Sequence, residues 1–331
     1  MSTIYEVAAR AEVSPATVSR VLNGTYVSEE KVNRVKQAIR DLDFSPNRTA
    51  RSLRRQHSQI IALIIPDIEN PFFTSIARGV EDVAQSAGYS VVLCNSDGEL
   101  AQEAYYLDIA ANDNMAGVIW APAADSSDLG RFHSPTRAVV AIDRHPAGRE
   151  TDAVLVDNQV AAYAATQSLF QQGYQRVACI TGPVDVETAV LRGAGWREAW
   201  SADENRVFSD EYLRYANFRV TGGRTALQSL LALPNPPDAV FVANNLMGVG
   251  VLQELFERRI TTAEFGVAIL GDLPYSSFIS LGATVIDVPA REMGAAAARL
   301  LLERIAGLTD PPRTEVLKCK VLIPRSGNHP E

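Results

Sequence analysis

The first 45 residues repeat apolar positions with the period of an α-helix in three short stretches. Thr3 and Ser14 carry hydroxyls that can accept a hydrogen bond from the first turn of a helix, and Pro15 suits the first helical position. Asn23-Gly24 tolerates the left-handed backbone that ends helices. The pattern therefore predicts three helices, over residues 4–11, 14–22 and 28–42.

Residues 46–58 break this pattern. Residues 48–55 have the length of about two helical turns, but Ala50 and Leu53 are their only apolar members. A helix this short and polar is marginal by itself in water. We expect it to order only when another molecule stabilises it.

From Gln59 onward, short continuous apolar runs alternate with helical stretches. Continuous apolar strands between helices are typical of parallel sheets that are covered on both faces. The length of the region predicts two such α/β lobes, with ligands at the carboxyl ends of the strands. The expected strands are residues 60–66, 90–94, 117–120, 138–142, 177–180, 239–242 and 266–270, and helices are expected near 73–88, 161–173 and 189–201.

The charge is distributed unevenly along the chain. The whole sequence carries a net charge of −8, yet residues 1–60 hold ten Lys and Arg against six Asp and Glu, a net charge of +4. The remainder holds 21 basic and 33 acidic residues, a net charge of −12. A basic N-terminal segment on an acidic body can concentrate attraction for phosphate at one end of the molecule.

Other features narrow the class of protein. No apolar run approaches the roughly 18 to 20 residues that cross a bilayer, and the N-terminus lacks the basic and apolar regions of a secretory signal. The three cysteines lie far apart, which favours a cytoplasmic protein without disulfides. Histidine spacing indicates no metal site, and no nucleophile or phosphate-binding motif indicates catalysis. We expect no enzyme activity, cofactor or metal.

Residues 3–23 closely resemble the headpiece of the lactose/galactose-repressor (LacI/GalR) family, and motifs similar to that family's hinge and core follow in order. The resemblance implies a helix-turn-helix whose second helix enters the major groove of operator DNA. There Arg20 suits a bidentate contact to guanine, whereas Pro15 and Ala16 offer only shape and methyl contacts. The expected headpiece contacts are Thr3, Tyr5, Ser14, Pro15, Ala16, Thr17, Ser19, Arg20 and Asn23.

Residues 46–53 resemble the family's hinge helix. In a dimer, paired hinge helices are implied to sit in the minor groove, where Leu53 would wedge into a base step and kink the duplex. An ordinary basic linker is the alternative. The expected hinge contacts are Asn47, Arg48, Ala50 and Leu53.

Several core motifs resemble the family's effector site. Residues 67–73 look like its D-x-x-N-P-F-F loop, and residues 141–144 look like its I-D-R motif after a strand. An arginine fork such as Arg192 suits pairs of ligand oxygens, whereas Trp196 suits either ligand stacking or core packing. The expected effector contacts are Asn70, Phe72, Phe73, Asp143, Arg144, Arg192, Trp196, Asn244 and Asp272.

Two positions depart from the family pattern. Asn245 stands where the family usually has aspartate, and Gly271 replaces the first of two aspartates. Loss of a carboxylate near Arg192 suggests a more positive cleft and an anionic ligand such as a sugar acid. A neutral sugar, a nucleoside or a lost response to ligand remain open.

Together these features predict an all-α helix-turn-helix headpiece and an α/β core of two doubly wound parallel-sheet lobes, similar to periplasmic binding proteins. The expected function is a homodimeric transcriptional repressor that binds double-stranded operator DNA under control of a small sugar or sugar acid. The alternative is a solute-binding protein, which would leave residues 1–57 unexplained. The expected domains are the headpiece 1–45, the hinge and linker 46–58, one lobe of 59–158 with 289–321, and another of 159–288 with 322–331.

Overall fold

The computed structural model describes residues 3–22, 25–44, 58–130, 137–146, 150–204, 206, 208–272 and 281–324. The chain divides into two compact units, Met1–Ser58 and Gln59–Glu331. Asn23 and the expected hinge contacts Asn47, Arg48, Ala50 and Leu53 lie outside the described residues.

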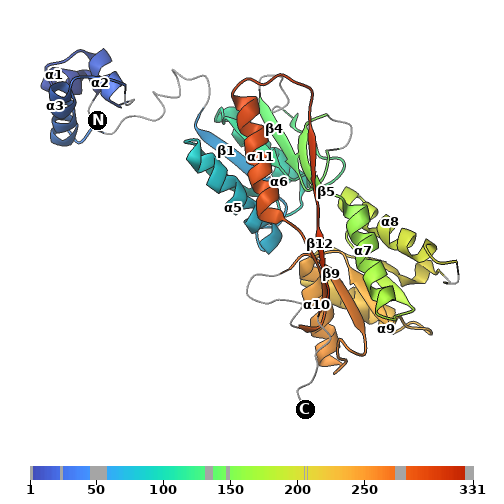
Figure 1. The fold of residues 1–331 in the computed structure, drawn as a ribbon. Helices are drawn as coiled ribbons and strands as arrows, with labels where there is room; N and C mark the ends of the chain where they lie inside the picture. The colour runs from blue at the N-terminus through green and yellow to red at the C-terminus, as the bar shows by residue number, and fades with distance from the viewer. Residues whose placement is uncertain are drawn as a thin grey trace. The chain divides into compact units, whose positions relative to one another are not determined.

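Over residues 3–22 and 25–44 the first unit forms the helices α1 (Ile4–Arg10), α2 (Pro15–Leu22) and α3 (Glu29–Asp41), which confirms the predicted elements there (Figure 1). Thr3 begins α1 with a capping box: its hydroxyl accepts from the Glu6 amide at 3.3 Å, and the Glu6 carboxylate accepts from the Thr3 amide at 2.7 Å. The Ser14 hydroxyl accepts from the Thr17 amide at 3.2 Å. The buried residues shared by the three helices are Val7, Ala8, Ala11, Val18, Val35 and Ala38.

The described residues of the second unit form two six-stranded sheets, ordered β11-β5-β4-β3-β1-β2 and β12-β10-β9-β8-β6-β7. Every strand pair is parallel except β10 with β12. The first sheet comprises β1 (Ile60–Ile65), β2 (Ser90–Asn95), β3 (Gly117–Trp120), β4 (Ala138–Ile142), β5 (Asp152–Val156) and β11 (Thr314–Leu317). The second comprises β6 (Val177–Thr181), β7 (Leu213–Tyr215), β8 (Ala239–Val242), β9 (Gly266–Leu270), β10 (Thr284–Asp287) and β12 (Lys320–Leu322).

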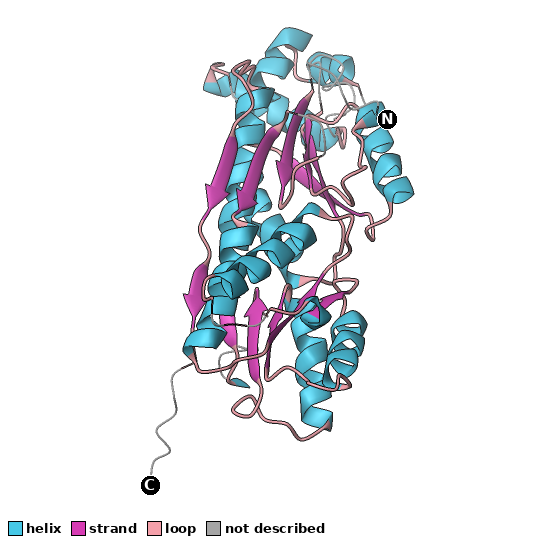
Figure 2. Ribbon diagram, turned by 90° about the vertical axis from the view of Figure 1, so that its right-hand side faces the viewer, coloured by secondary structure: helices cyan, strands magenta, loops and turns pink. Residues whose placement is uncertain are grey.

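Helices flank both sheets, as Figure 2 shows. They are α5 (Pro71–Ser86), α6 (Leu100–Asn112), α7 (Asn158–Gln171), α8 (Glu187–Ser201), α9 (Val220–Leu231), α10 (Asn245–Glu257) and α11 (Ala290–Ile305). Because the strands are covered on both sides, β1, β3 and β6 are apolar along almost their whole length. This arrangement confirms the predicted doubly wound lobes.

The chain passes between the two sheets three times: after β5, after β10 and after β11. The third passage lies between Leu317 and Lys320, because Lys320–Leu322 already forms β12 of the second sheet. The sequence placed that boundary slightly later, after residue 321. The β12 residues are exposed, so no buried apolar run marked the strand.

Two glycines allow α5 and α11 to lie against each other in the first lobe. A Cβ built on Gly79 would lie 2.0 Å from the Arg291 carbonyl oxygen, and one built on Gly294 would lie 2.1 Å from the Ile76 carbonyl oxygen. No side chain fits either position without moving a backbone. This close contact anchors the returning helix α11 on the lobe that begins at β1.

Candidate ligand-binding cleft and headpiece surface

A cavity of about 390 Å³ lies at the carboxyl ends of strands from both sheets. Its volume is within the range of small-molecule sites, and its position is the one that parallel α/β sheets use for ligands. The first lobe contributes the loops after β1, β2, β3 and β4, and the second lobe contributes those after β6, β7, β8 and β9, together with α8.

Seven of the nine expected effector residues line this cavity: Asn70, Phe72, Phe73, Asp143, Arg144, Arg192 and Asn244. Asp272 is not among the lining residues; its neighbour Gly271 is, and the backbone oxygen of Asp272 accepts from the Asn245 side chain at 3.2 Å. The placement of Trp196 corrects the prediction. Trp196 is fully buried in the second lobe, donates to the Val177 carbonyl at 2.9 Å and packs edge-on against Trp200.

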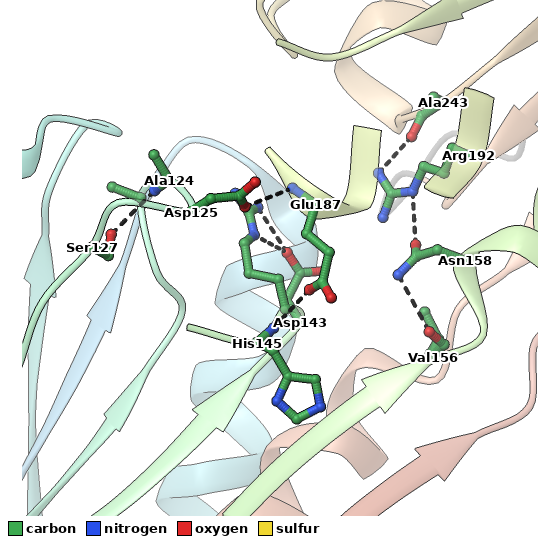
Figure 3. Close-up of polar contacts among 12 residues, drawn as sticks. Ala124, Asp125, Ser127, Asp143, His145, Val156, Asn158, Glu187, Arg192 and Ala243 are labelled. Carbon is green, nitrogen blue, oxygen red and sulfur yellow. Dashed lines mark hydrogen bonds and ion pairs between the residues drawn. The ribbon is translucent and has the colours of Figure 1, made fainter. Parts of the chain in front are cut away.

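Arg192 reaches the cavity from α8 and is held by two neutral acceptors. Its Nε donates to Asn158 Oδ1 at 2.8 Å, and one Nη donates to the Ala243 carbonyl at 2.8 Å (Figure 3). Asn158 is fixed in turn, because its amide donates to the Val156 carbonyl at 3.3 Å. Burial lowers the pKa of Arg192 to about 10, so the group is charged at neutral pH. Its second Nη makes no hydrogen bond to a described residue and is free for a ligand oxygen.

Phe218 forms an aromatic wall beside this guanidinium. Its ring centroid lies 6.0 Å from the central carbon of Arg192, and its backbone has the left-handed φ of +60°. The Asn244 side chain donates to the Phe218 carbonyl at 2.7 Å and caps α10 through the Met247 amide at 2.9 Å. Asn244 therefore fixes the wall. The sequence did not indicate Phe218, because the strained loop exists only in the folded chain.

Asp143 and Arg144 form a buried pair at the end of β4. Both Nε and one Nη of Arg144 donate to the same carboxylate oxygen of Asp143, at 3.1 and 2.8 Å. Asp143 adopts a φ of +72°, which turns the chain sharply after the strand. The pair supplies polar groups to the cavity with no net charge.

Glu103 holds the part of the cavity wall that the loop after β3 forms. Its carboxylate accepts from Trp120 Nε1 at 2.8 Å and from the Ala123 amide at 2.7 Å. Burial raises the pKa of Glu103, although its hydrogen bonds oppose the shift. The residue thereby fixes the loop after β3, in which Ala123 and Ala124 line the cavity.

The lining of the cavity carries more acidic than basic side chains. The cavity is bordered by five carboxylates and three guanidiniums: Asp67, Asp97, Glu99, Asp143 and Asp185, with Arg144, Arg192 and Arg219. Gly271 has a φ of +88°, a conformation that suits glycine and strains other residues. The loss of one aspartate there does not make the lining basic.

Helix α2 exposes three of the residues that are expected to contact DNA. Val18 faces the core of the three helices, whereas Pro15, Ala16 and Arg20 are exposed. Ser14 and Thr17 hydroxyls lie 2.9 Å apart at the start of α2, and Tyr5 is exposed on α1. Tyr26, which the sequence did not single out, is almost entirely exposed after the second helix.

Comparison with known proteins decides the family. Residues 3–47 match the model of bacterial regulatory proteins of the lacI family, and residues 58–326 match that of periplasmic binding proteins and the sugar binding domain of the LacI family. The chain belongs to the LacI family. It is a DNA-binding transcriptional repressor with a ligand-binding core, as the sequence predicted, rather than a solute-binding protein without a transcriptional role.

Individual LacI-family relatives align over nearly the whole chain. The ribose operon repressor of Halalkalibacterium halodurans is 35% identical and covers 92% of this chain and 91% of its own. The HTH-type transcriptional repressor PurR of Aliivibrio fischeri is 30% identical, with 92% of each chain covered. The fold is also that of the Lac repressor dimer bound to operator and an anti-inducer, with a TM-score of 0.84, 21% identity and 97% of each chain covered.

Within the described residues no helix is both long and apolar enough to span a membrane. In the same part of the chain no group of three or more His, Cys, Asp or Glu side chains is arranged to hold a metal ion.

Proposed function

We propose that this LacI-family repressor acts as a homodimer in the cytoplasm and that a neutral monosaccharide in the cleft controls its affinity for operator DNA. The observation that carries the proposal is the mixed lining of the cavity, with Arg192 as a buried hydrogen-bond donor, Phe218 as an aromatic wall and an excess of carboxylates. Hydroxyl groups can both donate to carboxylates and accept from a guanidinium. An anionic ligand would face repulsion from the carboxylates.

The ribose operon repressors among the relatives make D-ribose the first ligand to test. A nucleoside or its base is the second candidate, because the sequence left a nucleoside open. A sugar hydroxyl pattern fits the acid-rich lining better than a flat base does. The role proposed for the cleft is binding, with no catalytic step.

The dimer is supported by apolar surfaces on both lobes. In the second lobe, Phe256 is 83% exposed and Leu281 53% exposed beside a groove along α10. In the first lobe, Val92 and Leu93 are exposed on the edge strand β2. Exposed apolar patches of this kind mark interaction sites, and the Lac repressor of the same fold is a dimer on its operator.

We propose that α2 reads base edges and that the other expected contacts of the headpiece and the hinge hold the duplex. The two halves of a dimer would then read a near-palindromic operator. Ligand and DNA binding would be linked by a coupling free energy of about 1–3 kcal/mol.

Two measurements on the full chain test this proposal. Calorimetric titration compares D-ribose with D-ribonate and with hypoxanthine; we expect D-ribose to bind and D-ribonate to bind at least about tenfold more weakly, since it adds a charge among carboxylates. Hypoxanthine binding in place of the sugar would overturn the ligand assignment. Selection from random duplexes should enrich a near-palindrome whose affinity falls steeply with salt, and a failure to enrich any sequence would contradict the DNA-binding role.

A further inference from the structure

Helix α8 begins at the cleft without a cap of its own. Its N-cap residue is Val186, which has no side-chain acceptor. By contrast, α5 and α10, which also begin at the cleft, are capped by the side chains of Asn70 and Asn244. The first amides of a helix need an acceptor from outside the helix, so α8 has to obtain one elsewhere.

The missing acceptor comes from the other lobe. Asp125, in the loop after β3, accepts from the Glu187 amide at the first position of α8, at 3.1 Å (Figure 3). Glu187 reaches back, and its carboxylate accepts from the His145 amide after β4 at 2.8 Å. The Asp125 amide also donates to the Asp185 carbonyl at 3.2 Å. Each lobe thus supplies an acceptor for a backbone amide of the other.

We propose that the Asp125 and Glu187 carboxylates, each bonded to a backbone amide of the other lobe, form a latch across the cleft. The latch fastens the two lobes and makes both side chains positioning residues for the ligand. Neither residue lines the cavity. In a capping box the two bonds are reciprocal between the N-cap residue and the third helical residue of one helix. In the latch, Asp125 accepts from the Glu187 amide and Glu187 accepts from the His145 amide, so both bonds link the two lobes. Opening the cleft breaks both at once and leaves the N-terminus of α8 uncapped.

Asp125 contributes through both its acceptor oxygen and its charge. A carboxylate at a helix N-terminus is stabilised by the aligned backbone dipoles, and Asn is as good a cap as Asp. Asp125→Asn therefore keeps the cap and loses the charge, whereas Asp125→Ala loses both. Loss of a helix cap, over the range measured in other helices, would increase the equilibrium constant for opening of the cleft about twofold to thirtyfold.

The latch is tested first without any ligand, by amide hydrogen exchange in the full-length protein. We expect Asp125→Ala to speed exchange at residues 184–190 and also at the His145 amide in the first lobe, by about twofold to thirtyfold. Glu187→Ala should speed exchange at the same two places. Asp125→Asn and Glu187→Gln should stay within about threefold of wild type, and Asp108→Ala on α6 is the control for loss of a surface carboxylate from the same lobe.

Acceleration confined to residues 184–190 would show a local cap that does not join the lobes, and unchanged exchange in both alanine variants would show no latch; either result overturns the proposal. The effect on ligand retention, which rests on the proposed function, is measured with D-ribose: Asp125→Ala should release the sugar faster with little change in its association rate. If wild type does not bind D-ribose, the ligand assignment fails and the exchange experiment still decides the latch.

Discussion

Replacing the buried Glu103 tests how the first lobe holds the cleft wall. This carboxylate is 1% exposed and accepts from Trp120 Nε1 and from the Ala123 amide. In Glu103→Leu both donors lose their partner in a dry interior. Each unpaired buried donor costs about 1–3 kcal/mol, so the free energy of unfolding should fall by roughly 2–6 kcal/mol, a large part of the 5–15 kcal/mol that is typical of a folded domain.

Glu103→Gln keeps an acceptor oxygen and removes the charge. Because burial raises the pKa of Glu103 in the folded protein, the folded state holds a proton at pH values where the unfolded state has lost it. The free energy of unfolding of the wild type therefore falls as pH rises from the ordinary glutamate pKa of about 4.3 to the raised one. Glu103→Gln should lack this decrease, so its stability relative to wild type should grow with pH and then level off.

Urea unfolding between pH 4 and pH 8, followed by tryptophan fluorescence, measures both effects. Glu315→Gln, at an exposed position on β11, is the control for loss of a carboxylate elsewhere in the same sheet. Equal stability of the Leu and Gln variants would refute the assigned hydrogen bonds. A constant difference between Glu103→Gln and wild type across this pH range would refute the raised pKa.

Four further outcomes follow from other sites. Arg192→Met should weaken D-ribose binding by about 10- to 100-fold, because a charge-assisted hydrogen bond is lost. Arg197→Met, on the exposed side of the same helix, should leave binding unchanged, and an equal loss in both variants would contradict the role of Arg192. Gly294→Ala should lower the free energy of unfolding by about 1–3 kcal/mol, because its Cβ meets the Ile76 carbonyl, whereas Gly193→Ala has room and should raise it by about 0.5–1 kcal/mol. Burial opposes ionisation of Asp152, but the hydrogen bonds from Arg304 and from the Arg313 amide outweigh burial and lower the pKa of Asp152. The stability that this carboxylate provides should therefore be lost only as pH falls below the ordinary aspartate range. Asp152→Asn should remove that pH dependence in acid unfolding. Arg20→Ala should reduce operator affinity by about 1–3 kcal/mol and relax preference at one base pair, which selection from random duplexes would detect, whereas a uniform loss across sequences would indicate a phosphate contact.

The strands were predictable where burial on both faces of the sheet gives a continuous run of apolar residues. Strands β1, β3, β4, β6, β8 and β9 are apolar runs and were expected at nearly their observed positions. Strand β5 begins with the buried carboxylate of Asp152, which Arg304 pairs from a distant helix. Strand β12 is exposed and short. Strand β12 therefore gives no hydrophobic period, and both its pairing and the ion pair of Asp152 in β5 depend on the tertiary structure.

The same limit applies to the cleft. Polar motifs directly after apolar strands located Asn70, Asp143 and Asn244, because the carboxyl ends of parallel strands converge. Trp196 was wrongly included, since it lies one helical turn after Arg192 on the same face of α8. That turn is enough to take the ring from the cleft into the core. The spacing of residues along the sequence predicts the face of the helix on which a side chain lies, but it does not predict how deeply that side chain is buried.

Helix α8 carries both the proposed ligand contact and the proposed latch, and their magnitudes can be compared. Coupling between effector and DNA in allosteric proteins is typically about 5- to 150-fold, whereas the loss of one cap changes an equilibrium by about twofold to thirtyfold. A ligand shifts the lobes only by its difference in affinity for the two states. Because neither bond of the latch involves a ligand atom, the latch sets the population of the closed cleft and cannot itself report occupancy. The bonds that we propose between the ligand and each lobe, with Arg144 on one side and Arg192 on the other, would therefore supply the coupling. Breaking the latch should then shift the sugar concentration needed for operator release more than it changes the maximal response.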